Sequence, residues 1–236
     1  MTSRRSEESC CRGSTTMTPE EVRTEIEALT ADLISSGICI DQNYPALRRQ
    51  GDIAEIDFGR GADLSITLKN VPYADAYSVL KADRSYNMRL IDGGLIQTLY
   101  TFKGGHLVKH RLAFFPSPDL LEYQNNSEIY ELDEIYGDVI DRNVVTVPIR
   151  FDFDKDAAID YDHPVSHLTI GQYRNCRIPV SGGIGPFYFV NFILRSFYNT
   201  PFRKLCAELR EGRHGFEDTI TDRERRHLHV RVCEIG

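Results

Sequence analysis

The sequence predicts an α+β protein in which an antiparallel sheet of about six to eight strands is covered by N-terminal and C-terminal helices. A capped amphipathic pattern comes first, short alternating runs separated by glycine-rich turns fill the centre, and a strongly apolar helical pattern follows. Residues 1–16 are polar and aperiodic. We therefore expect a disordered N-terminal tail at 1–16 and one domain over 17–236.

The first helix is expected over about residues 19–36. Thr18 is a suitable N-cap, Pro19 fits the first helical position, and Gly37 ends the apolar pattern. Met17 lies directly before this cap. It is therefore a candidate for the start of translation.

The centre of the chain is expected to be an antiparallel meander. Alternating runs at 53–58 and 64–68 flank two glycines and predict a hairpin. Glycine-rich turns separate three further runs, which predict strands at 86–90, 96–102 and 108–115. The remaining elements are expected as a helix at 74–81, a helix at 127–139, a strand at 144–153, helices at 186–198 and 201–211, and a strand at 228–232.

Composition limits the function classes. The chain has 28 basic and 35 acidic residues, net −7, so any nucleic-acid contact must come from a local basic cleft. Six cysteines without a C-x-x-C pair argue against a zinc ribbon and a disulfide scaffold, which favours a cytoplasmic location. The longest apolar run, 186–194, is far short of the roughly 20 residues of a membrane helix, so we expect no membrane partner.

Negative charge is concentrated at residues 119–162, where 13 acidic residues stand against three basic ones. Runs of like charge are usually solvated surface. The alternative is a protein partner that binds the acidic segment 127–141. The apolar helix at 187–198 is a second candidate interface, although a helix that is apolar nearly all round is usually buried.

The densest cluster of reactive side chains lies between residues 150 and 177. On a strand, Arg150 and Asp152 share the polar face. His163 and His167 have the spacing of a helical zinc pair, but Pro164 disfavours that helix, and we expect neither a metal nor another cofactor.

Histidines and arginines together can cleave a phosphodiester without a metal. Histidine serves as general base and general acid near neutral pH, and arginine stabilises the charge that develops on the phosphoryl oxygens. The candidate catalytic residues are His163, His167 and Arg150. The candidate phosphate-binding residues are Arg111, Arg174 and Arg177. The competing interpretation is a structural network of ion pairs.

Three further segments carry weaker signals. On the strand at 108–115, Arg111 is expected on the exposed face and His110 against the core. The glycines at 182–185 precede a helix and can cradle an anion there, or can simply form a turn. The polar face of the run at 227–231 can touch phosphate, or can be a charged edge strand.

The stretch from His163 to Ser181 contains two specific pieces, His-Pro-x-x-His-Leu-x-x-Gly and Arg-Ile-Pro-Val-Ser. With the aromatic helix that follows Pro186, it resembles the bacterial family called domain of unknown function 2290, over about residues 17–210. This resemblance implies a prokaryotic, cytoplasmic protein without assigned activity and supplies no catalytic residues.

A fainter likeness to TumE-type toxins rests on Asp92-Gly93, Arg111 and the two histidines at 163 and 167. It places nucleic-acid cleavage first among the enzymatic interpretations, with a toxin or defence setting as the matching hypothesis.

Two functions follow from the sequence. The first is a metal-independent phosphodiesterase or RNase-like activity on RNA or DNA. The alternative is a non-catalytic module that binds another protein. The observation that separates them is whether five side chains converge in one solvent-accessible cleft: Arg111, Arg150, His163, His167 and Arg177.

Overall fold

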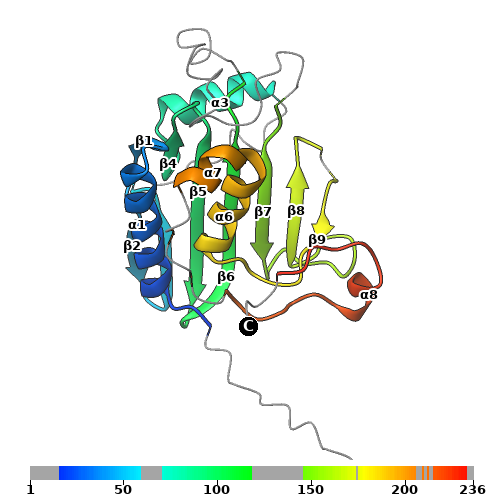
Figure 1. The fold of residues 1–236 in the computed structure, drawn as a ribbon. Helices are drawn as coiled ribbons and strands as arrows, with labels where there is room; N and C mark the ends of the chain where they lie inside the picture. The colour runs from blue at the N-terminus through cyan, green and yellow to red at the C-terminus, as the bar shows by residue number, and fades with distance from the viewer. Residues whose placement is uncertain are drawn as a thin grey trace, which may run out of the picture.

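The computed structural model describes residues 16–59, 71–118, 146–173, 175–205, 209, 212 and 215–232 (Figure 1). Its helices are α1 (Pro19–Ser35), α3 (Tyr73–Ala82), α6 (Pro186–Phe197), α7 (Asn199–Leu205) and α8 (Asp222–Arg225). Its strands are β1 (Cys39–Gln42), β2 (Ala46–Gln50), β3 (Ile53–Asp57), β4 (Met88–Leu90), β5 (Leu95–Lys103), β6 (His106–Phe115), β7 (Ile149–Asp154), β8 (Ser166–Ile170) and β9 (Ile178–Pro179).

The predicted capping of the first helix is confirmed. The Thr18 hydroxyl accepts the N–H of Glu21 at 3.3 Å, and the Glu21 carboxylate accepts the N–H of Thr18 at 2.9 Å. These two bonds satisfy donors that a helix start otherwise leaves unpaired. Gly37 follows with φ +76°, the left-handed conformation that favours glycine. The helix is thus fixed at both ends by local sequence.

The nine described strands form one antiparallel sheet, in which seven follow the order β1-β4-β5-β6-β7-β8-β9. The other two branch from it, since β2 pairs with β3 and β3 pairs with β5. β6 occupies one edge of β5, and β4 and β3 share the other edge. The α+β class and the meander are confirmed, with a sheet slightly larger than the expected six to eight strands.

The two faces of the sheet are covered differently. α1 and α6 pack on one face, in front of the sheet in Figure 1, and bury one large core; in it the Phe151 ring lies 6.1 Å from the Phe189 ring. α3 packs on the opposite face over Leu95 and Phe115. The prediction that the apolar helix near residues 187–198 is core is confirmed. No helix among the described residues is long and apolar enough to cross a membrane.

Of the hairpin predicted between 53–58 and 64–68, the second run lies outside the described residues, and the first run has other partners. β3 is paired on one side with β2 and on the other with β5 along Ile53–Ile56, so both of its edges are occupied. The turn that we overlooked is the two-residue Gly51-Asp52 connection between β2 and β3.

The last predicted strand is wrong. Within 228–232, Val230 makes a single bridge to Val180, and Leu228 is 88% exposed, so no strand forms there. β7 begins at Ile149, later than expected, and α7 begins at Asn199, before Pro201. Residues 1–15 of the expected tail, the acidic segment 127–141 and the helix predicted at 127–139 lie outside the described residues.

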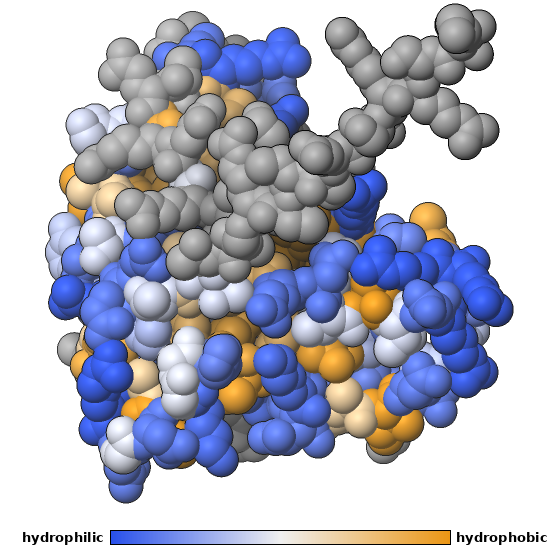
Figure 2. All heavy atoms as spheres, turned by 90° about the horizontal axis from the view of Figure 1, so that it is seen from below, coloured by the Kyte–Doolittle hydropathy of each residue, from blue (hydrophilic) through white to orange (hydrophobic). Residues whose placement is uncertain are grey.

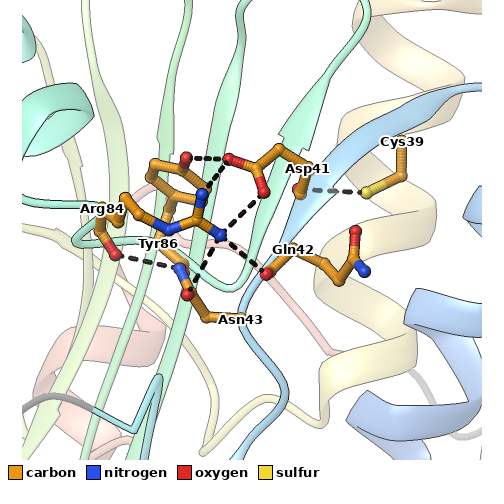
Figure 3. Close-up of polar contacts among 6 residues, drawn as sticks. All are labelled: Cys39, Asp41, Gln42, Asn43, Arg84 and Tyr86. Carbon is orange, nitrogen blue, oxygen red and sulfur yellow. Dashed lines mark hydrogen bonds and ion pairs between the residues drawn. The ribbon is translucent and has the colours of Figure 1, made fainter.

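A polar network fixes β1 at the edge of the sheet (Figure 3). The guanidinium of Arg84 donates to both carboxylate oxygens of Asp41, at 2.9 and 2.7 Å, and the Tyr86 hydroxyl donates to the same carboxylate. Burial raises the pKa of Tyr86 to about 12. Arg84 has φ +53°, a conformation that costs energy for a residue with a side chain. The Asn43 side chain donates to the Arg84 carbonyl at 3.0 Å and so helps to hold this conformation.

Candidate functional site

A cleft of about 730 Å³ opens on the sheet face opposite α6, over β6, β7 and β8. Five predicted residues line it together: Arg111, Arg150, His163, His167 and Arg177. They come from β6, β7, β8 and the segments that flank β8. The expected convergence is therefore observed, whereas Arg174 lies outside the described residues.

Strand register explains the centre of the cleft. Arg111 lies opposite Asp152, and Asp152 lies opposite His167, so one row of side chains crosses three strands on one face. The alternation predicted for β7 is confirmed: Phe151 and Phe153 face the core, and Arg150 and Asp152 face the cleft.

Asp152 bridges two guanidinium groups. Its Oδ1 accepts the Nε–H of Arg111 at 3.0 Å, and its Oδ2 lies 3.7 Å from Nε of Arg150. The three side chains are only 15 to 17% exposed. Burial by itself would raise the pKa of Asp152, but the two guanidiniums outweigh it and hold that pKa below its usual range. The ion pairs of the competing structural interpretation are thus also present.

His167 has a defined tautomer. Its Nδ1 lies 3.1 Å from the carbonyl oxygen of Pro164, and because a carbonyl only accepts hydrogen bonds, Nδ1 carries the proton. Burial lowers the pKa of His167, although the neighbouring Asp152 opposes this. The lowered pKa favours the neutral ring, in which Nε2 holds a lone pair.

His163 stands edge-on to this ring. The ring centroids of His163 and His167 are 4.9 Å apart, and the planes cross at 75°. His163 is paired with Ile159 in a short bridge, and the chain then enters β8 at Ser166. The bridge gives His163 the strand-like pairing that a following proline favours.

The charges of the cleft are unevenly balanced. Lys109 pairs with Asp154 at 2.9 Å at one end of the cleft. Among the described lining residues, four basic side chains stand against two acidic ones, so their formal charges sum to +2 with the histidines left out of the count. The described lining is therefore locally positive, in a chain whose net charge is −7.

His110 also borders the cleft, but its imidazole belongs to the core, as predicted. It is 1% exposed, stacks on Phe153, and accepts the N–H of Ile184 through Nε2 at 3.1 Å. Burial lowers its pKa to about 4, so the ring is neutral and structural.

The anion site considered at residues 182–185 is wrong. These residues are buried, and a Cβ at Gly182 would lie 2.6 Å from the backbone oxygen of Glu217. At the start of α6 the N–H of Phe187 already donates to the Glu25 carboxylate at 2.8 Å. The glycines permit close packing, and a carboxylate of the chain itself takes the place proposed for phosphate.

The histidine-rich run at 227–231 lies elsewhere. The ring centroids of His227 and Tyr161 lie 5.1 Å apart, beside α8. None of the residues 227–231 lines the cleft. Seen from below (Figure 2), the right-hand part of the molecule, where α8 lies in Figure 1, is mainly hydrophilic with isolated apolar places.

Sequence reasoning overlooked the aromatic end of the cleft. Tyr73 from α3, Phe115 from β6 and Tyr173 from the turn after β8 all line it. The available signal was Tyr173, a large aromatic in a polar turn that begins with a glycine. Tyr73 and Phe115 carried no such signal, because apolar residues in a helix and a strand are ordinarily core.

Residues 38–232 match the family DUF2290, described as an uncharacterized conserved protein. The chain belongs to this family. The matched range includes the whole described sheet and every described residue that lines the cleft. The family resemblance expected from residues 163–181 is therefore confirmed. No curated protein and no solved structure matched the chain, and the likeness to TumE-type toxins gains no support. Within the described ranges, no three histidine, cysteine, aspartate or glutamate side chains are grouped as metal ligands.

Proposed function

We propose that the cleft is the active site of a phosphodiesterase that cleaves RNA by general acid–base catalysis without a metal. The observation that carries the proposal is the His167 ring, whose Nδ1 is fixed by the Pro164 carbonyl and which lies beside a second imidazole in a cleft whose described lining is positive. A base held in one tautomer, an acid within reach and several cations are what this chemistry requires.

The roles follow from the geometry. His167 is the base, and its Nε2 takes the proton of a ribose 2′-hydroxyl while that oxygen forms a bond to phosphorus. The bond between phosphorus and the 5′-oxygen breaks, and His163, as the general acid, gives a proton to that oxygen. The products are a 2′,3′-cyclic phosphate and a 5′-hydroxyl. RNA is preferred over DNA because DNA lacks the nucleophile.

The arginines bind the phosphate. Asp152 offsets one of the two positive charges of Arg111 and Arg150, and it holds both guanidiniums in place. Arg150 and Arg177, which also line the cleft, would stabilise the negative charge that builds on the phosphoryl oxygens. In this proposal the ion pairs are the support of the site, so the structural and catalytic interpretations do not exclude each other.

The test is cleavage of a labelled RNA in the presence of EDTA. The variant His167→Asn keeps an N–H that can donate to Pro164 but lacks the basic nitrogen, and we expect its rate to fall by about 10²- to 10⁴-fold. His227→Ala, outside the cleft, is the matched control and should cleave as fast as the wild type. Both variants should melt within a few degrees of the wild type. Failure of the wild-type protein to cleave, or full activity of His167→Asn, would overturn the proposal.

The alternative of a non-catalytic protein-binding module depends on the acidic segment 127–141, which lies outside the described residues. The other candidate interface, α6, is buried in the core. The phosphodiesterase is therefore the function for which the described residues offer a site.

A further inference from the structure

The cleft has two chemically different ends. At one end are the paired histidines and the row formed by Arg111, Asp152 and His167. Phe115 is four residues further along β6, which at about 3.4 Å per residue puts it roughly 14 Å from Arg111. The cleft is therefore about long enough for a dinucleotide, and longer than a single phosphate group needs.

The far end presents an aromatic ring to solvent. Tyr173 lines the cleft and is 75% exposed. A tyrosine so exposed contributes little to the packing of the protein, because most of its ring remains in contact with water. Its neighbours on the cleft wall, Tyr73 and Phe115, are largely buried and form an apolar floor.

The turn that carries Tyr173 is held from both sides. The N–H of Gly171, with φ +68°, donates to Pro148 at 2.7 Å, and the Gln172 side chain donates to the backbone oxygen of Val71 at 3.0 Å. The Tyr173 carbonyl accepts the N–H of Cys176 at 3.2 Å. The ring is thus displayed on a fixed backbone, which reduces the entropy that binding must offset.

From this arrangement we infer that Tyr173 is a stacking platform for a base of single-stranded RNA whose phosphate lies at the histidines. The inference rests on the proposed function and adds the strandedness of the substrate. Every base has a π-face that can stack on tyrosine, so the platform needs no particular sequence. Bases inside a duplex are already stacked on their neighbours and cannot use it.

The test measures binding without cleavage. A fluorescent single-stranded 2′-O-methyl RNA has no free 2′-hydroxyl, so it binds without being cut, and its anisotropy gives Kd for the full chain. Stacking of one base predicts that Tyr173→Ala raises Kd about 5- to 100-fold and that Tyr173→Phe stays near the wild type. Tyr44→Ala is the matched control, because Tyr44 is also exposed but lies beside β1, at the other edge of the sheet.

The possible results separate the two claims. An unchanged Kd for Tyr173→Ala, or equal affinity of the wild type for the single strand and its duplex, overturns the platform even where RNA is cleaved. The expected rise in Kd supports the platform, including in a protein that cleaves nothing, in which case only the proposed chemistry fails. For cleavable RNA, Tyr173→Ala should raise KM and leave kcat nearly unchanged.

Discussion

The carboxylate of Asp152 should contribute more to stability than that of any surface ion pair in the described sheet. Asp152→Ala removes the anion shared by Arg111 and Arg150, whose side chains are 17 and 16% exposed. Removal of one partner from a buried pair typically costs about 3–5 kcal/mol. At roughly 2–4 °C per kcal/mol for a chain of this size, the melting temperature should fall by about 6–20 °C.

Urea unfolding at pH 7, followed by circular dichroism, measures this loss. The matched control is Asp218→Ala, which breaks an ion pair with Arg225 at 2.8 Å whose side chains are about half exposed; such pairs contribute about 1 kcal/mol or less. The folded-state pKa of Asp152 is lowered, so its stabilisation is complete above the unfolded pKa and disappears as the pH falls through the folded pKa. Equal losses for the two variants would refute the assignment of Asp152 as the centre of the cleft.

Two further predictions concern the framework of the site. His110 is buried with a pKa of about 4, so between pH 6.5 and 4 the unfolded chain binds more protons than the folded protein. The free energy of unfolding should therefore decrease by up to about 3 kcal/mol as the pH falls through this range. Urea titrations should show a smaller decrease for His110→Gln, and an identical pH profile would contradict the buried neutral ring. Gly182→Ala should lower the free energy of unfolding by about 1–3 kcal/mol, because the added Cβ meets the Glu217 carbonyl. The control Gly104→Asn, at a position with open space and φ +58°, should stay within about 0.5 kcal/mol of the wild type. A tolerated Gly182→Ala in the same unfolding assay would argue against the close packing.

Local signals in the sequence were sufficient for the elements that carry their own caps and turns. The first helix has its capping residues, and the meander of β4, β5 and β6 is separated by Asp-Gly-Gly and Lys-Gly-Gly turns. The partners of β3 were not predictable in the same way, because pairing is decided by tertiary contacts and the Gly51-Asp52 turn competed with a more glycine-rich one nearby. The run at 228–232 alternates correctly, yet Val230 finds only a single bridge.

The charged half of the site was predictable for a related reason. Alternation along β7 put Arg150 and Asp152 on one face, and Pro164 favoured an extended conformation at His163, whose ring lies beside that of His167. The aromatic half was not, since its residues come from a helix, a strand and a turn that only the folded sheet brings together. The glycines before α6 misled the prediction, because a glycine-rich helix start suits a close packing contact as well as an anion.

The central claim is that a histidine in this cleft activates a ribose 2′-hydroxyl. The most direct test is an oligodeoxynucleotide with a single ribose, incubated with the wild-type protein in EDTA and analysed by mass spectrometry. The account predicts one cut, on the 3′ side of the ribose, that leaves a 2′,3′-cyclic phosphate and a 5′-hydroxyl. Cleavage at the deoxyribose linkages would contradict it. So would failure of the protein to cut both this oligonucleotide and a control strand made wholly of ribonucleotides.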